Sequence, residues 1–419
     1  MSLNLPFVME FVVYLTNRCN LRCEMCSQYG DNFKEFAGKE LSFEEWKPFF
    51  DSISDVTPKP KIILMGGEPL LYKEFDRILE YLNNNDFSIH IVTNGVFLDK
   101  HKEAISKCKD ITVTVSIDGL ENTHDSIRRV KGTFKKAINN IALFEKERKN
   151  NPNFKIFINS VLLPDNIKES AKFLEFIQTQ GIDQIVFQHL QFLTQEQNDK
   201  ADKEWQARLS GRFNNNLIPN KQYIIDENYV KDLKTAINSL SDVCKKETFV
   251  FPYLDDNELD KYYLGKDLET IRPNYRCTTP WLTAFISPEG NVSNCIENTI
   301  GNILEENFWD IWNNEKASFF RQNLCENGNF SVCSRCCNFY KSNFLYAKNA
   351  KVRVRGKEIN LPSELNFIKP APDGVFILDK TQSTEYDLHA IPQEIHSQEM
   401  LEDIQKHHTI LGFFSEIEN

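Results

Sequence analysis

Hydrophobic and polar residues follow two regular patterns over about the first 195 residues of the chain. Six short segments rich in β-branched and aliphatic residues indicate strands, and apolar residues at helical spacing lie between them. The clearest helical pattern covers residues 133–147, a second covers 167–180, and a capping-box sequence at Ser42 marks the start of another helix. The predicted strands are residues 11–15, 61–65, 89–92, 111–117, 154–162 and 184–190.

Strands that alternate with helices predict a parallel sheet with right-handed crossovers, either an open doubly wound sheet or a barrel. In both architectures the chemistry gathers at the carboxyl ends of the strands. Turn-forming and polar sequences stand at four successive strand ends. Each one alone is explained as a turn, but four of them beside a group of cysteines predict an active site. They are the cysteine loop after 11–15, Gly66-Gly67-Glu68-Pro69, Thr93-Asn94-Gly95 and Asp118-Gly119.

Charge and hydropathy exclude several classes of function. The chain has 49 basic and 60 acidic residues and a net charge of −11, and no basic face stands out, which argues against nucleic-acid binding by counterion release. The longest apolar run near the start, residues 11–15, is far too short to span a membrane. No basic segment with a cleavage site precedes it. The sequence therefore predicts a cytoplasmic protein that contacts neither membrane nor nucleic acid.

The eleven cysteines fall mainly into two groups. Three lie at positions 19, 23 and 26, and six lie between 277 and 337. An odd number of cysteines in a chain without a secretion signal argues against a disulfide framework, and clustered thiols in a reducing compartment usually hold metal. Cys108 and Cys244 stand alone, and we expect them to be buried as small hydrophobic residues.

The first group predicts an iron–sulfur site. Cys19-x3-Cys23-x2-Cys26 offers three thiolates from one loop, whereas structural zinc commonly takes four ligands from two separated pairs. Three soft ligands suit a [4Fe-4S] cluster with one iron left open. An open iron can bind a ligand that is not protein, so we expect this site to be catalytic.

The cysteine loop, the Gly-Gly-Glu-Pro motif and the six β-α units together resemble the radical S-adenosylmethionine superfamily over about residues 8–195. Met25 stands where that family most often has an aromatic residue. The resemblance implies a partial (β/α)6 barrel whose cluster is held by Cys19, Cys23 and Cys26. It also implies that the fourth iron binds S-adenosylmethionine, and that one electron from a flavodoxin- or ferredoxin-type reductant yields a 5′-deoxyadenosyl radical that abstracts a substrate hydrogen.

The same resemblance implies a set of residues that contact S-adenosylmethionine. The two glycines would allow close approach of the methionine moiety, the glutamate would accept from its ammonium group, and residues of the later strands would reach the carboxylate, ribose and adenine. The histidine has an alternative role as a buried structural residue, and we expect Asp118 to be a turn former. The predicted contacts are Gly66, Gly67, Glu68, Thr93, Asn94, Ser116, Arg128, Asn159, Ser160 and His189.

The second cysteine group resembles the SPASM/twitch extension of this superfamily. The chain lacks the Cys-x2-Cys-x5-Cys-x3-Cys run of a full SPASM domain, so we expect a small twitch-like domain with one auxiliary [4Fe-4S] cluster. A structural zinc knot is the alternative. Cys325 and Cys337 would compete for ligand positions, remain thiols, or donate a hydrogen atom to a substrate radical. The predicted ligands are Cys277, Cys295, Cys333 and Cys336.

These observations predict four regions and one principal activity. The regions are a barrel (1–195), a helical linker (196–275), the auxiliary domain (276–345) and a C-terminal extension (346–419). The predicted activity is oxidation or epimerisation of a small metabolite such as a sugar, a cyclitol or a nucleotide-linked compound, because no leader-binding module precedes the first strand. The alternatives are maturation of a ribosomally made peptide, activation of a partner enzyme, or a non-catalytic scaffold.

Overall fold

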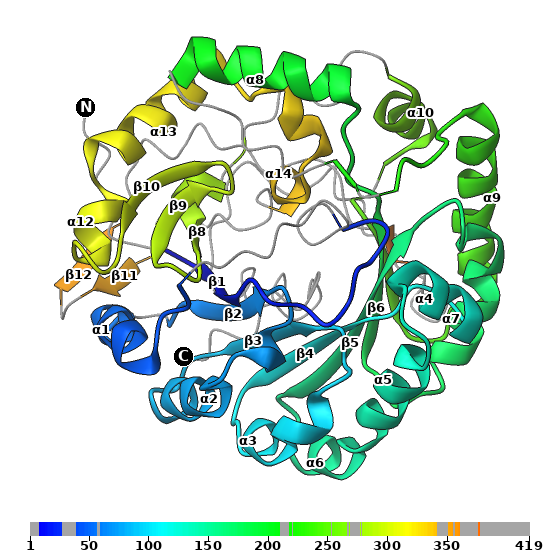
Figure 1. The fold of residues 1–419 in the computed structure, drawn as a ribbon, viewed down its shortest axis with the longest axis horizontal. Coiled ribbons are helices and arrows are strands. Elements are labelled where there is room, and N and C mark those ends of the chain that lie inside the picture. Colours follow the sequence, from blue (N-terminus) through cyan, green and yellow to red (C-terminus); the bar gives the residue numbers. More distant parts are fainter. Residues whose placement is uncertain are drawn as a thin grey trace.

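The computed structural model describes most of the chain, and Figure 1 shows its ribbon. The described residues are 8–26, 39–56, 59–209, 218–219, 221–252, 254–265, 268, 277 and 279–341, together with the short strands 351–354, 357–360 and 376–377.

All six predicted strands are present, and they pair in sequence order as a parallel sheet. A seventh parallel strand follows at the far edge, within the region that the sequence predicted as a helical linker. The strands are β1 (Glu10–Thr16), β2 (Lys61–Gly66), β3 (Ile89–Thr93), β4 (Ile111–Ser116), β5 (Phe154–Leu162), β6 (Gln184–His189) and β7 (Glu247–Phe251).

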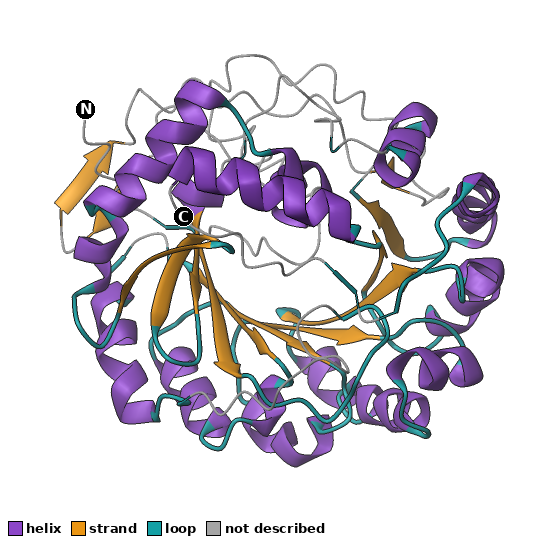
Figure 2. Cartoon of the chain, turned by 45° about the horizontal axis from the view of Figure 1, so that its top comes forward, coloured by secondary structure: helices purple, strands orange, loops and turns teal. Residues whose placement is uncertain are grey.

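Helices cover the convex outer face of this curved sheet, as Figures 1 and 2 show. The predicted helix over 133–147 is instead two helices, and the buried Phe144 between them packs its ring 5.4 Å from that of Phe154. The outer helices are α1 (Phe43–Ile53), α2 (Phe75–Asn84), α3 (Lys102–Ser106), α4 (Glu121–Arg128), α5 (Thr133–Ala142), α6 (Glu145–Asn150) and α7 (Ser170–Ile177).

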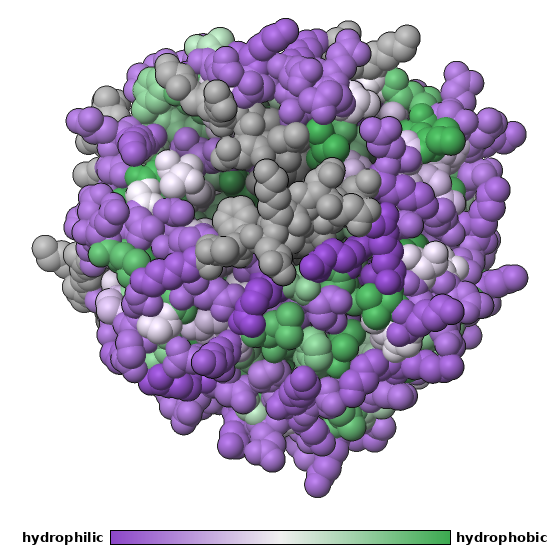
Figure 3. All heavy atoms as spheres, in the orientation of Figure 1, coloured by the Kyte–Doolittle hydropathy of each residue, from purple (hydrophilic) through white to green (hydrophobic). Residues whose placement is uncertain are grey.

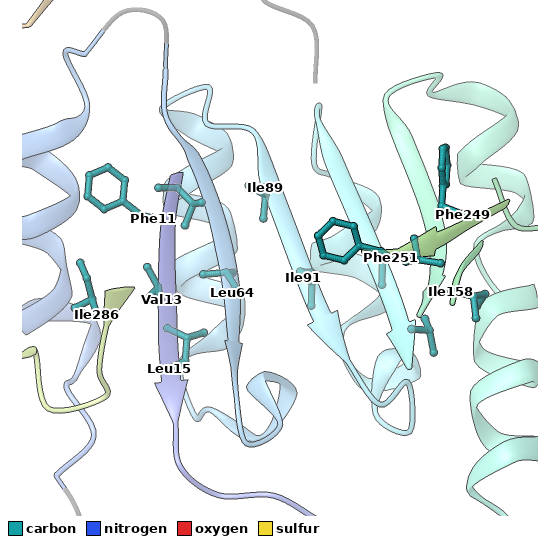
Figure 4. Close-up of a cluster of buried hydrophobic side chains, with 14 of the residues drawn as sticks. Phe11, Val13, Leu15, Leu64, Ile89, Ile91, Ile158, Phe249, Phe251 and Ile286 are labelled. Atoms are coloured by element: carbon teal, nitrogen blue, oxygen red, sulfur yellow. The ribbon is translucent and has the colours of Figure 1, made fainter. Parts of the chain in front are cut away.

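Strand alternation divides the sheet into two faces. On β1, Phe11, Val13 and Leu15 join the large core beneath the helices, part of which Figure 4 shows. Val12 points to the opposite face, where it forms a small separate cluster with Ile63 of β2. We call this second, concave side the inner face.

The auxiliary region continues the same sheet. Strand β8 (Thr283–Ile286) pairs parallel to β1, and β9 (Asn291–Cys295) and β10 (Asn298–Asn302) follow it antiparallel. On the opposite edge, β13 (Phe376–Ile377) pairs antiparallel to β7. The sheet therefore has eleven strands in the order β10-β9-β8-β1-β2-β3-β4-β5-β6-β7-β13 and does not close on itself. This is the predicted α/β architecture of a partial barrel.

Helix α8 (Gln195–Leu209) ties the barrel to the auxiliary region. Its Glu204 Oε2 accepts hydrogen bonds from the backbone and hydroxyl of Ser331 at 2.9 and 2.6 Å, and Trp205 packs 4.5 Å from the ring of Phe330. The remaining helices are α9 (Glu227–Val243), α10 (Asp256–Leu264), α11 (Thr279–Leu282), α12 (Phe308–Trp312), α13 (Glu315–Asn327) and α14 (Cys337–Lys341), with short 3-10 turns η1 (Pro69–Leu71), η2 (Leu98–His101), η3 (Ile167–Glu169) and η4 (Ser331–Arg335).

The C-terminal extension is described only in part. Its strands β11 (Lys351–Val354) and β12 (Lys357–Asn360) form an antiparallel pair, and residues 378–419 lie outside the described residues. Cys108 and Cys244 are buried in the core, as predicted. No helix in the described part of the chain is long and apolar enough to cross a membrane. The face drawn in Figure 3 is largely hydrophilic, with apolar residues in small separate patches.

Candidate active site

The loop that leaves β1 carries the first three cysteines to the carboxyl end of the sheet. Cys23 is buried, and Cys19 and Cys26 are half-buried. Burial raises the pKa of Cys19 to about 12, and the neighbouring Glu68, Cys23 and Cys26 add to this rise, whereas the backbone N–H of Leu21 opposes it. The three thiols thus lie close enough to repel one another as anions, an arrangement that a cationic iron centre would stabilise.

Gly66 and Gly67 let the strand β2 approach this loop. A Cβ atom on Gly67 would lie 2.2 Å from the carbonyl oxygen of Arg18, and one on Gly66 would lie 2.4 Å from that of Thr16. The backbone N–H groups of Gly67 and Glu68 donate to these same two oxygens, each at 2.8 Å. The glycines therefore position the cysteine loop itself, a packing role that the sequence did not reveal.

Glu68 joins the ends of β2 and β3. Its Oε1 accepts from the Thr93 hydroxyl at 2.6 Å, and its Oε2 accepts from the Asn94 backbone N–H at 2.8 Å. The Asn94 side chain then donates to Asn20 of the cysteine loop at 2.8 Å. Burial raises the pKa of Glu68 to about 7. Three predicted cofactor residues thus form one buried network that reaches the cysteine loop.

Arg128, at the end of α4, lies between a cysteine and a carboxylate. Its Nη1 donates to the Cys23 sulfur at 3.6 Å, and its Nε and Nη2 donate to Asp118 Oδ2 at 2.6 and 2.5 Å. Burial alone would lower the pKa of Arg128, but Asp118 and Cys23 outweigh this effect and raise it. Asp118 is fully buried and holds an ion pair, so its expected role as a turn former was incomplete. Its place at a strand end, ten residues before an arginine, was the only available signal.

The inner face of the later strands carries some of the remaining predicted residues. Ser116 pairs in register with Asn159, whose Nδ2 donates to Gln188 at 3.1 Å. The Oδ1 of Asn159 is buried and accepts no hydrogen bond within the described structure, so it is available for a ligand's donor. Ser160 is also buried, but strand alternation turns it to the helix-covered face with Ile158. The structure therefore does not bring Ser160 together with Asn159.

His189, at the end of β6, lies in an aromatic cluster. Its Nδ1 is 3.0 Å from the hydroxyl of Tyr263, and its ring packs against Tyr262 and Tyr263 of α10. Burial lowers its pKa to about 3, which keeps the imidazole neutral. These contacts are those of a buried structural residue. Its Nε2 is buried and has no hydrogen-bond partner among the described residues, so the cofactor contact of His189 stays a prediction.

The four predicted auxiliary ligands come together from separate parts of the chain. Cys295 ends β9, Cys333 lies in η4, and Cys336 follows it. Burial raises the pKa of Cys333, and the nearby Cys277 and Cys295 raise it further. The pKa of Cys336 is likewise raised by burial and then by Cys337, Cys333, Cys277 and Cys295. These four half-buried thiols therefore lie together in one group.

Two further thiols and a tyrosine lie in this region. Cys325 is on α13 and is half-buried against the core. Cys337 begins α14 and acts electrostatically on Tyr14 of β1. The pKa of Tyr14 is raised by burial first, and then by Cys337, Glu297 and Cys336. The sequence analysis missed Tyr14. It lies two residues after Val12 on the same strand, so strand alternation was a usable signal that both face the inner side.

The two thiol groups lie toward opposite ends of β1. The strand runs for six steps from Glu10 to Thr16, which is about 20 Å at about 3.3 Å per residue, and then enters the cysteine loop. Thr283 of β8 pairs with Glu10, and the antiparallel return of β9 carries Cys295 back toward that level. Tyr14 lies between them on the inner face. A partial α/β barrel with a thiol group toward each end of its inner face would suit two separate iron–sulfur centres.

Comparison with known families identifies the class. The model of the radical SAM superfamily matches residues 13–177, and that of the SPASM iron–sulfur cluster-binding domain matches residues 277–337. The chain thus carries a radical SAM domain and a SPASM-type iron–sulfur domain, as its motifs predicted. These two domains imply a [4Fe-4S] cluster, S-adenosylmethionine and an auxiliary iron–sulfur cluster.

Individual relatives cover different shares of the chain. Fe-coproporphyrin III synthase of Methanosarcina barkeri is 28% identical over 179 residues, 42% of each chain. The sporulation killing factor maturation protein SkfB of Bacillus subtilis is 33% identical over 146 residues, 33% of each chain. Both matches thus span less than half of the relative. A tungsten-containing aldehyde ferredoxin oxidoreductase cofactor-modifying protein of Pyrococcus furiosus is 25% identical over 78% of this chain and 88% of its own.

A solved structure shares the fold. Streptococcus suis SuiB bound to S-adenosylmethionine superposes with a TM-score of 0.54 at 17% identity, over 80% of this chain and 76% of SuiB. The residues of this chain fit the cofactors that the family implies. The three loop cysteines would hold the first cluster, and the buried Asn159 Oδ1 offers an acceptor that a ribose hydroxyl would satisfy.

Proposed function

We propose that this enzyme abstracts a hydrogen atom from a small metabolite bound on the inner face of the sheet, and that the outcome is oxidation or epimerisation. The observation that carries the proposal is the position of Tyr14. The pKa of its phenol is raised by burial and by the nearby Cys337, Glu297 and Cys336, and its strand leads into the Cys19 loop. A substrate beside Tyr14 would lie between the two centres.

Neutral polar side chains on the inner face suit a hydroxyl-rich substrate. Besides the predicted cofactor contacts Ser116 and Asn159, Tyr14 and Gln188 are half-buried and present a phenol and an amide group. Such neutral donors and acceptors favour a sugar, a cyclitol or a nucleotide-linked compound. Their partial burial would also keep water from a reactive radical. We retain the expectation of a cytoplasmic enzyme supplied with electrons by a flavodoxin or ferredoxin.

Each centre has a defined set of residues. When bound, the cluster at Cys19, Cys23 and Cys26 and S-adenosylmethionine supply a 5′-deoxyadenosyl radical. For an oxidative outcome, the substrate radical must lose one electron and one proton. Cys277, Cys295, Cys333 and Cys336 would hold the group that accepts such an electron.

For epimerisation, the substrate radical must instead gain a hydrogen atom from the opposite side. The Cys337 thiol is a better donor than Cys325, because it lies near Tyr14 on the inner face. The S–H bond of Cys337 breaks, a C–H bond forms on the substrate, and a thiyl radical remains. One electron from the external reductant and one proton from solvent restore the thiol.

A peptide substrate is the second candidate, and the comparisons favour it. SkfB is a maturation protein by name, and SuiB has been solved bound to the precursor peptide SuiA with a TM-score of 0.54 to this chain. A peptide would place one residue beside Tyr14 and extend out of the barrel.

The two candidates differ in what accelerates cofactor cleavage. Reduced, reconstituted protein is incubated with S-adenosylmethionine and either the small-molecule or the peptide fraction of a cell extract, and 5′-deoxyadenosine is quantified. A metabolite substrate predicts faster formation with the small-molecule fraction alone. Acceleration by the peptide fraction alone would reject the metabolite proposal.

Deuterium incorporation distinguishes epimerisation from oxidation. In D2O, an epimerase transfers one deuterium from the exchanged Cys337 thiol to the product carbon, and an oxidase transfers none. Cys337→Ala should keep 5′-deoxyadenosine formation and lose the deuterated product, while the matched control Cys325→Ala should keep both. Retained deuterated product in Cys337→Ala would exclude Cys337 as the donor.

A further inference from the structure

Arg128 contacts a ligand of the first cluster directly. Its Nη1 is 3.6 Å from the Cys23 sulfur, and the guanidinium is almost entirely buried, with about 10% of its side chain exposed. A buried cation that donates to a thiolate acts in a medium where charge is poorly screened. Its effect on the cluster should therefore be large compared with that of a surface charge.

Asp118 fixes this guanidinium in place. Its Oδ2 accepts from Nε and Nη2 of Arg128, and its Oδ1 accepts from the backbone N–H of Val161 at 2.8 Å. The backbone N–H of Asp118 donates to His124 Nδ1 at 3.1 Å. The carboxylate is thus held from β5 and from α4 at once, with none of its side chain exposed. It also brings a negative charge near the cluster, which opposes the charge of the arginine.

We propose that Arg128 and Asp118 set the reduction potential of the cluster held by Cys19, Cys23 and Cys26. Reduction adds one negative charge to the cluster. The positive charge and hydrogen bond of Arg128 stabilise the reduced form and raise the potential, whereas Asp118 lowers it and keeps the arginine directed at Cys23. Both are positioning residues. The inference rests on the family's first cluster and is independent of the substrate proposed above.

The two charges predict shifts of opposite sign. The midpoint potential of the reconstituted full-length protein is measured by an EPR-monitored redox titration without S-adenosylmethionine. The relevant signal is the one that changes when S-adenosylmethionine is added afterwards. Arg128→Met should shift this potential to a more negative value. Asp118→Asn removes the negative charge but keeps an amide oxygen that accepts from Arg128, so it should shift the potential to a more positive value. Arg128→Lys keeps the charge and should lie between Arg128→Met and the wild type.

Arg129→Met is the matched control, because it removes a charge from the next residue, whose Nε lies 4.0 Å from Glu24 Oε1. Its potential should equal that of the wild type. If Arg128→Met binds no cluster, Arg128→Lys and Asp118→Asn still carry the test. An unchanged potential in Arg128→Met with weaker S-adenosylmethionine binding would make Arg128 a cofactor contact only and would overturn the inference. Shifts of the same sign in Arg128→Met and Asp118→Asn would also overturn it.

Discussion

Gly67→Ala should displace the cysteine loop and remove the first cluster. The new Cβ would lie 2.2 Å from the Arg18 carbonyl oxygen, whereas ordinary contacts begin at 3.4 Å, so that oxygen must move by about 1.2 Å. This movement strains the hydrogen bond from Glu68 N to Arg18 O. Overpacking costs about 1–3 kcal/mol and one lost hydrogen bond about 1 kcal/mol, which gives about 2–4 kcal/mol in the free energy of unfolding.

The assay is iron and acid-labile sulfide per chain after anaerobic reconstitution, together with S-adenosylmethionine binding. Gly67→Ala should lose about four of about eight iron atoms and all detectable S-adenosylmethionine binding. Gly132→Ala is the control, because Gly132 has a positive φ of 84° but nothing within 4 Å of its Cβ position. It should cost about 1–2 kcal/mol of stability and keep all its iron. Full iron content in Gly67→Ala would refute the packing role of this glycine.

Three further substitutions test other parts of the site. Burial raises the pKa of Glu68 from 4.5 to about 7, so between these pH values the folded chain binds a proton that the unfolded chain does not. The free energy of unfolding should therefore fall by about 3 kcal/mol as the pH rises from 4.5 to 7. Urea unfolding of Glu68→Gln should lack this pH dependence, and a difference from the wild type that is the same at every pH would contradict the prediction. His189→Phe removes the hydrogen bond to Tyr263, so the free energy of unfolding should fall by about 1 kcal/mol. The affinity for S-adenosylmethionine, measured by calorimetry, should stay unchanged, and a large loss of affinity would show that His189 contacts the cofactor. The buried guanidinium of Arg335 lies 4.4 Å from the ring centre of Phe192, a cation–π contact. Arg335→Met should therefore lower the free energy of unfolding by about 2 kcal/mol. An unchanged midpoint of urea unfolding would show that this contact contributes nothing.

The strand pattern predicted the barrel well for a physical reason. Strands of a parallel sheet are short runs rich in β-branched and aliphatic residues, and their ends need turn residues, so the sequence records both. The seventh strand was missed because Glu247–Phe251 is short and follows a helix-rich segment without a motif. The pairing of β8 with β1 is a contact between residues more than 270 positions apart, which local patterns do not encode.

The candidate site was predicted unevenly for a similar reason. Cysteine spacing within a loop is local, so the first thiol group was readable from the sequence. The directions of Ser160 and His189 depend on strand parity at the end of a strand, where one residue changes the face. Asp118 gains its significance from its ion pair with Arg128, and Tyr14 from its nearness to Cys337, and only the fold reveals either.

The central claim is that this chain holds two iron–sulfur centres with distinct roles on one inner face. The most direct test is the count of iron and acid-labile sulfide per chain in the wild type and in Cys333→Ala/Cys336→Ala. We predict about eight of each in the wild type and about four in the double variant, which should still cleave S-adenosylmethionine. About four iron atoms and one zinc ion in the wild type, with four iron atoms retained in the double variant, would contradict the account and make the second site structural.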